Sequence, residues 1–260
     1  MTRRNSLKIN SLLKRIPRGM VLTPCLLKAK GISSKLAWWY VQSGWLARID
    51  RGIYKLAGDS ITWAGVLSTL SSEYPTVHLG GKTALQVLGK SHYIAVNFIK
   101  QKLQLFSPAG VKLPRWVNTH SLEEKFQLHA TSLFSGLEDE KLSLLNHKHD
   151  NLSIQVSAPE RAALEVCYLV PKVINFQEAA LLIENLLRLR PQLVQTLLES
   201  CQSIKVKRLF LYLSEYYQHT WLSELDLTKI ELGKGKQLIA GGGVYDAKYK
   251  ISVPNLGDGS

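Results

Sequence analysis

The stretch GWLARIDRGIYKL, residues 44–56, has the pattern of a short β-hairpin. Apolar residues flank a polar bend, Asp50-Arg51-Gly52, that ends in a glycine, as tight turns between two strands commonly do. Two arginines, Arg48 and Arg51, lie around this bend. The question is whether they serve folding alone or are directed at a negatively charged partner.

Positive charge is concentrated around this hairpin. Residues 1–58 contain 12 of the 33 Lys and Arg residues but one of the 20 Asp and Glu residues, Asp50, so this quarter of the chain carries +11 of the net charge of +13. Such a field attracts polyanions, and the release of counterions from nucleic acid makes the binding favourable and sensitive to salt. An acid-poor N-terminus is also typical of an organellar transit peptide, but three tryptophans and a hairpin favour a packed domain.

The residues before the hairpin predict three helices. Capping residues, prolines and glycines give their limits. The first helix begins after Ser6 and ends at Pro17, a short apolar strand covers 20–22, the second helix runs from Thr23-Pro24 to Lys30 with Gly31 closing it, and the third begins after Ser33 or Ser34 and ends near Ser43-Gly44. This order is that of a winged helix-turn-helix, in which the third helix enters the major groove and the hairpin, called the wing, contacts the backbone or minor groove.

The third helix and the wing supply the candidate DNA contacts. Leu36, Tyr40 and Trp39 are expected to face inward. The opposite stripe of the helix then carries Ser34, Lys35, Trp38 and Gln42. A helical phase that differs by one residue exchanges the roles of Trp38 and Trp39, and for either tryptophan core packing is favoured over base contact. Glutamine can pair with adenine, lysine can reach guanine or phosphate, and arginine suits phosphates or a narrow minor groove; for Arg51 an ion pair with Asp50 is the alternative. The candidate DNA-binding residues are Thr23, Ser33, Ser34, Lys35, Trp38, Gln42, Arg48 and Arg51.

The whole chain is predicted to be an α+β protein with a winged helix-turn-helix domain at 1–58 and a larger mixed α/β domain at 59–260, which can be subdivided into a mixed part 59–156 and a helix-rich part 157–260. In SAPE, residues 157–160, a capping box is expected. The residues between 123 and 150 are expected to be the loosest part. Helices are predicted at 63–70, 83–88, 159–169, 177–189, 192–200 and 206–217, and strands at 76–79, 97–106, 236–240 and 249–253.

Signals for catalysis are weak, and no catalytic residue, metal or cofactor is expected. Gly81-Lys82-Thr83 imitates the end of a phosphate-binding loop, but Thr76 stands where its first glycine is required. Glu123-Glu124-Lys125 has the spacing of metal-dependent nucleases, without an aspartate at a useful distance upstream. His147 and His149 alone do not make a metal site.

The location expected from the sequence is the cytoplasm. Cys25, Cys167 and Cys201 are odd in number and form no CxxC motif, which fits a reducing compartment. No apolar run is long enough to span a membrane, and no secretory signal is expected.

Six segments resemble the AbiEi antitoxins, transcriptional regulators of bacterial abortive-infection, type IV toxin–antitoxin modules. The wing GWLARIDRGIY is the first of them. The others are VHLGGKTALQVLGKSHYIAV (77–96), VKLPRWV (111–117), SAPERAALEV (157–166), LRPQLVQTLLESCQSIKVKRLFLYL (189–213) and GGGVYDAKYKISVP (241–254). Together they follow the order of the family along nearly the whole chain.

The resemblance implies a two-domain protein whose winged helix binds inverted repeats in the promoter of its own operon and represses it. Its C-terminal domain would counter a nucleotidyltransferase-like toxin, commonly without a stable complex. Arg48 and Arg51 match basic positions of the family, whereas Asp50 stands where many relatives have a small residue. Lys205, Lys207 and Arg208 form a candidate second surface for anions, with a solvated helix start as the alternative.

Two other functions stay open at this point. One is a nucleic-acid-processing enzyme, in which a nuclease-like C-terminal domain is targeted by the winged helix. The other is an adaptor whose C-terminal domain binds a protein partner directly.

Overall fold

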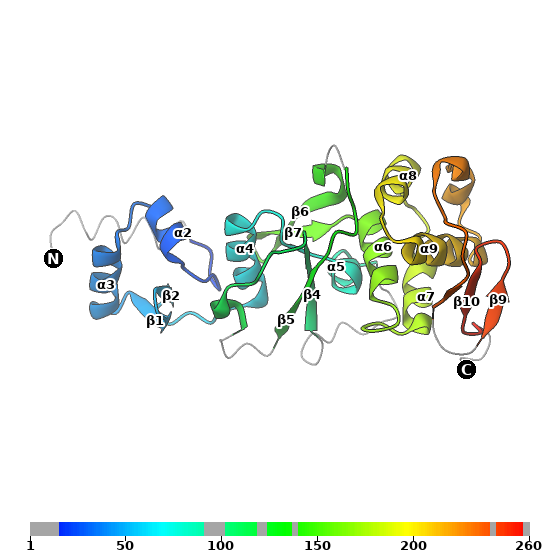
Figure 1. Cartoon of the computed structure of the whole chain (residues 1–260). Coiled ribbons are helices and arrows are strands. Elements are labelled where there is room, and N and C mark those ends of the chain that lie inside the picture. Colours follow the sequence, from blue (N-terminus) through cyan, green and yellow to red (C-terminus); the bar gives the residue numbers. More distant parts are fainter. Residues whose placement is uncertain (1–15, 91–101, 119–123, 137–139, 240–242, 257–260) are drawn as a thin grey trace. The chain divides into compact units, whose positions relative to one another are not determined.

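The computed structural model describes residues 16–90, 102–118, 124–136, 140–239 and 243–256 (Figure 1). The helix expected after Ser6 and the first part of the strand expected at 97–106 lie outside these ranges. The chain forms two compact units. The described residues of Met1–His78, Phe98–Leu128 and Asn146–Gln155 belong to the first, and those of Leu79–Asn97, His129–Leu145 and Val156–Ser260 to the second.

Helices α2 (Pro24–Ala29) and α3 (Ser34–Gln42) begin and end as their sequences predict. The Thr23 hydroxyl accepts a hydrogen bond from the backbone N–H of Leu26, and Ser33 caps α3 in the same way. Both helices end in a glycine with positive φ, 75° at Gly31 and 73° at Gly44. The two N–H groups at each end, those of the glycine and of the next residue, bond back to the last helical turn, which is the Schellman arrangement.

The hairpin follows α3 directly. Strands β1 (Leu46–Asp50) and β2 (Ile53–Leu56) are antiparallel, with Leu46 opposite Leu56 and an irregularity between Arg48 and Asp50. Leu22 bridges to Tyr54 through two backbone hydrogen bonds of 2.8 and 3.0 Å, so the apolar stretch at 20–22 adds a third strand position. The first unit therefore contains a winged helix, and the chain as a whole is α+β, as predicted.

Helix α4 (Trp63–Glu73) packs closely against the chain that leads into α2. A Cβ atom at Gly65 would lie 1.9 Å from the carbonyl oxygen of Gly19, so only glycine allows this approach. The Thr69 hydroxyl donates to the Val21 carbonyl over 2.8 Å. Both contacts hold the apolar strand of the winged helix against α4.

A five-stranded sheet has the order β5-β4-β3-β7-β6. Strand β3 runs parallel to β7, with Leu79 opposite Val156. Asp150 and Asn151, both at positive φ, form the bend between β6 and β7. The segment 123–150, expected to be the loosest part, contributes two of these strands, β5 and β6, which the sequence did not predict. The strands are β3 (His78–Leu79), β4 (Lys102–Ser107), β5 (Lys125–Ala130), β6 (Leu144–His149) and β7 (Leu152–Ser157).

The helices of the second unit agree with the predicted ranges within a few residues, with α7 ending earlier than expected. The capping box at 157–160 is wrong, although α6 itself is confirmed. Ser157 donates to Glu165 instead of capping α6, and Glu160 binds Arg190. The helices are α5 (Gly81–Val87), α6 (Pro159–Leu169), α7 (Phe176–Glu184), α8 (Pro191–Ser200) and α9 (Ile204–Tyr216), with short 3-10 turns at Arg115–Asn118, Glu140–Ser143, Thr220–Glu224 and Leu227–Lys229.

A small three-stranded sheet follows α9, with the order β8-β10-β9. The two expected strands correspond to β8 (Gln237–Leu238) and β10 (Ile251–Val253), which pair in parallel. The sequence did not indicate β9 (Val244–Asp246), which pairs antiparallel to β10. Among the described residues, no helix has both the length and the apolar character needed to cross a membrane.

Candidate nucleic-acid interface

Helix α3 has one buried and one exposed face, as an amphipathic recognition helix requires. Ala37 and Tyr40 are buried, and burial raises the pKa of the Tyr40 phenol. The side chain of Leu36 is half-buried. The predicted polar stripe of Ser34, Lys35 and Gln42 is exposed, so these side chains are available to a partner.

Trp38 is 58% exposed, as expected for the stripe that it shares with Ser34, Lys35 and Gln42. Trp39 is also exposed, at 44%, because Ala37 and Tyr40 occupy the inward positions of the helix. The core packing favoured for either tryptophan is therefore wrong. Trp45, which the sequence did not single out, is also exposed at 38%. Three indoles therefore lie at the surface of a segment rich in positive charge.

The wing arginines are both exposed, and the main chain of the bend organises them. Arg48 donates from its Nε to the backbone carbonyl of Asp50 over 3.2 Å. The Asp50 carboxylate accepts the backbone N–H of Arg51 over 2.6 Å. Both Asp50 and Arg51 are among the described residues, and no ion pair joins their side chains. The hydrogen bond between them uses the backbone N–H of Arg51, so the Arg51 guanidinium is not neutralised by its neighbour.

The two cap residues differ in accessibility. Ser33 is exposed, although its hydroxyl caps α3. Thr23 is buried, and its hydroxyl also donates to the carboxylate of Glu73. The Thr23 side chain thus stabilises the start of α2, and because it is buried it cannot contact a phosphate.

The second anionic surface proposed around Lys205, Lys207 and Arg208 is wrong, since these side chains point inward. Lys207 and Arg208 are buried, and Arg208 is only 1% exposed. Lys205 donates to the carbonyls of Tyr168 and Val170, and burial lowers the pKa of its ammonium group. The start of α9 is therefore a structural element.

Arg208 holds the segment after the last 3-10 turn to α9. Its Nε donates to the carbonyl of Leu232 over 2.7 Å, and its Nη atoms reach the carbonyls of Gly233, Gly235 and Lys250 over 2.9, 2.5 and 3.2 Å. These oxygens replace the water that a buried guanidinium loses.

The segment Gly81-Lys82-Thr83 is also structural. The N–H of Gly81, at the start of α5, donates to the Glu165 carboxylate over 2.9 Å. Lys82 forms an ion pair with Glu178. A carboxylate thus occupies the position that a phosphate takes in a phosphate-binding loop, and the lysine is already neutralised.

Nothing described supports the nuclease motif. Glu123 lies outside the described residues, and within those residues no three His, Cys, Asp or Glu side chains gather as metal ligands would. His147 and His149 belong to β6 instead of the predicted polar loop, and the ring of His149 lies 4.6 Å from that of Trp63.

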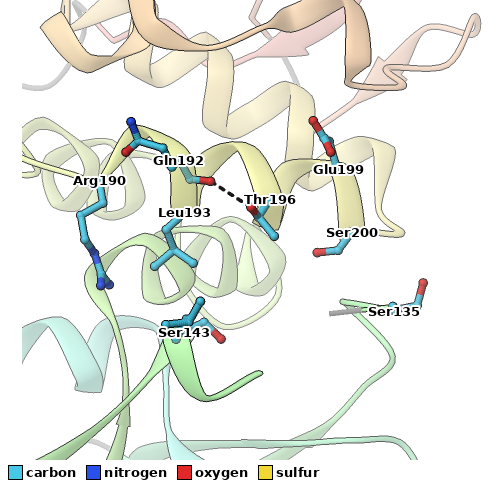
Figure 2. Close-up of a pocket in the computed structure, with 10 residues that line it drawn as sticks. Ser135, Ser143, Arg190, Gln192, Leu193, Thr196, Glu199 and Ser200 are labelled. Carbon is cyan, nitrogen blue, oxygen red and sulfur yellow. Dashed lines mark hydrogen bonds between the residues drawn. The ribbon is translucent and has the colours of Figure 1, made fainter. Parts of the chain in front are cut away.

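Figure 2 shows a hollow of about 710 Å³ beside α8 in the second unit. Leu193, Thr196 and Ser200 of α8 line one side, and Ser135 and Ser143 line the other (Figure 2). Arg190, at the beginning of α8, also borders it.

The arginine that borders this hollow is engaged in an ion pair. Arg190 binds both carboxylate oxygens of Glu160 over 3.0 Å. Burial raises the pKa of Glu160, but the hydrogen bonds from Arg190 outweigh this effect and the pKa is lowered. The described lining offers one carboxylate, Glu199, and no histidine or cysteine.

The fold is shared with a solved structure from a bacterium. The crystal structure of the RV2827C protein from Mycobacterium tuberculosis is 13% identical in sequence, with a TM-score of 0.59, over 96% of this chain and 92% of that one. At this identity the likeness concerns the fold alone. The search of curated proteins gave no match.

Two family models cover almost the whole chain. Residues 5–96 match the N-terminal domain of the AbiEi antitoxin transcriptional regulators, and residues 100–254 match the model described as transcriptional regulator, AbiEi antitoxin, type IV TA system. The first match extends past the boundary expected at residue 58, which stays a prediction. The winged helix, its exposed basic face and the two consecutive matches lead to one conclusion: this chain belongs to the AbiEi family of transcriptional regulators, the antitoxins of type IV toxin–antitoxin systems.

Proposed function

We propose that this protein binds inverted repeats in the promoter of its own operon and represses transcription. Helix α3 enters the major groove with Ser34, Lys35, Trp38 and Gln42, and the wing places Arg48 and Arg51 on phosphates or in the minor groove. The observation that carries the proposal is the exposed stripe of α3 next to two exposed arginines. Both belong to a segment that holds +11 of the net charge of +13.

The C-terminal part counteracts a nucleotidyltransferase-like toxin encoded by the same operon, without a stable complex. The family to which the chain belongs supports this role, since its members are type IV antitoxins. Arg208, Glu160 and Glu165 stabilise the helices of this part and are not free for chemistry. We therefore assign no reaction to it.

Removal of both wing arginines tests the DNA-binding role. The double variant Arg48→Ala/Arg51→Ala should bind the DNA upstream of its gene more weakly, because two phosphate contacts are lost. The slope of log affinity against log salt should flatten by about one to two units. Gel shifts at several salt concentrations measure both quantities.

Arg188→Ala is the control, because it removes an exposed arginine from the connection between α7 and α8 in the second unit, without touching α3 or the wing. It should leave affinity and slope unchanged. The double variant should still rescue cells from the co-expressed toxin, since repression and neutralisation are separate. Unchanged DNA affinity in the double variant would refute the role of the wing.

A further inference from the structure

Trp38 is the most exposed tryptophan of the winged helix, at 58%. Tryptophan is over-represented at binding interfaces, where it combines a large apolar face with one hydrogen-bond donor. The described residues 16–58 contain seven Lys and Arg residues against one acid, Asp50. A second copy of this surface would be repelled by the same charge, whereas a polyanion would be attracted.

Trp38 lies on the same face of α3 as two polar residues that are candidates for base contact, Lys35 and Gln42. Lys35 precedes it by three residues and Gln42 follows it by four, so the three side chains share one helix face. Lys35 and Gln42 are exposed, while Ala37 and Tyr40 fix the opposite face in the core. If α3 lies in the major groove, the indole meets base edges between the two polar side chains.

One base edge matches an indole. In the major groove, the apolar group on a base is the C5-methyl of thymine, which lies next to the O4 acceptor. An indole offers an apolar face and a single donor, Nε1–H. Adenine, guanine and cytosine present acceptors and donors without an apolar group.

We propose that Trp38 is a specificity-determining residue that reads a thymine of the operator half-site through its C5-methyl group. This inference rests on the proposed function, because it requires α3 to lie in the major groove of the operator. It goes beyond that function by naming one base of the operator, thymine, and the residue that recognises it, Trp38.

Replacement of thymine by uracil removes the methyl group and keeps base pairing and O4. The probe is the duplex upstream of the protein's own gene, amplified with dTTP or with dUTP. The wild-type protein should bind the uracil duplex about four-fold more weakly for each methyl contact, which corresponds to the ~0.8 kcal/mol of a buried methylene. Fluorescence anisotropy at fixed salt measures both affinities.

Three variants locate the effect. Trp38→Ala should weaken binding to the thymine duplex and lose the discrimination between the two duplexes. Trp38→Phe keeps an apolar ring and should retain part of the discrimination between the two duplexes. Trp45→Ala is the matched control, because it removes another exposed indole and should discriminate as the wild type does. Since the Trp38 side chain is exposed, its truncation should leave the thermal unfolding midpoint unchanged.

Three results would overturn the inference alone, and a fourth would refute the function on which it rests. Equal binding of both duplexes by the wild type, with specific binding intact, removes thymine reading and leaves the proposed function standing. Equal discrimination by wild type and Trp38→Ala assigns the methyl effect to DNA shape. A change in oligomeric state in Trp38→Ala, without a change in discrimination, assigns the indole to a second copy. Absence of specific binding by the wild type refutes the proposed function itself.

Discussion

Asp50 has a double role at the tip of the wing. Its carboxylate accepts the N–H of Arg51, and its backbone carbonyl accepts the Nε of Arg48. The acid thus stabilises the bend from which both arginines extend. It also places a negative charge beside them, in a surface that we expect to approach phosphates.

These two effects can be separated by substitution. Asp50→Asn keeps a side-chain oxygen for the Arg51 N–H and removes the charge, so it should bind operator DNA about two- to five-fold more tightly at low salt. Asp50→Ala removes the charge and the hydrogen bond together and should gain less. Paired gel shifts measure this difference. If Asp50→Asn binds more weakly than the wild type, the carboxylate positions the arginines in a way that the amide cannot replace.

Single residues show where sequence reasoning is weakest. The exposure of Trp38 and Trp39 depends on the rotation of α3, and a shift of one residue turns the helix by about 100°, which is enough to exchange the expected roles of these two side chains. Lys207 and Arg208 look like surface cations in the sequence. The carbonyls that accept hydrogen bonds from Arg208 lie between Leu232 and Lys250, more than twenty residues later in the sequence. No local sequence pattern predicts these contacts.

Elements were predicted well where local chemistry decides them. Thr23-Pro24, Ser33, Gly31 and Gly44 mark the limits of α2 and α3, because caps and left-handed glycines act within one turn. The capping box at the start of α6 was predicted wrongly because a distant contact decides it. Glu160 accepts its hydrogen bond from Arg190, which lies thirty residues later in the sequence. Strands β5, β6, β7 and β9 were not predicted, and for β9 the reason is that three residues of an edge strand carry too little pattern.

Gly44 connects the recognition helix α3 to the wing. Its φ is 73°, and its N–H bonds to the carbonyl of Val41 while that of Trp45 bonds to Tyr40. Gly44→Ala should lower the free energy of unfolding by about 1–2 kcal/mol, because an L side chain is strained at this φ. Gly44→Asn, which tolerates this region better, should cost less. Urea unfolding followed by tryptophan fluorescence compares them, and equal losses would contradict the backbone explanation.

At the scale of the whole molecule, the excess positive charge is concentrated in residues 1–58. Residues 59–260 carry only +2 of the net +13, and several of their cations are buried or paired with carboxylates. The α+β class and the winged helix follow from patterning, and two family models cover the chain in order. Strand order in the five-stranded sheet could not be predicted, because β3 pairs with β7 across more than seventy residues.

The central claim is that the winged helix recognises the promoter of its own operon. Hydroxyl-radical footprinting of the purified full chain on its upstream DNA, against a scrambled duplex of the same composition, tests it most directly. We expect two protected inverted half-sites, with protection that weakens as salt rises and disappears in Arg48→Ala/Arg51→Ala. Equal and uniform protection of both duplexes would contradict it.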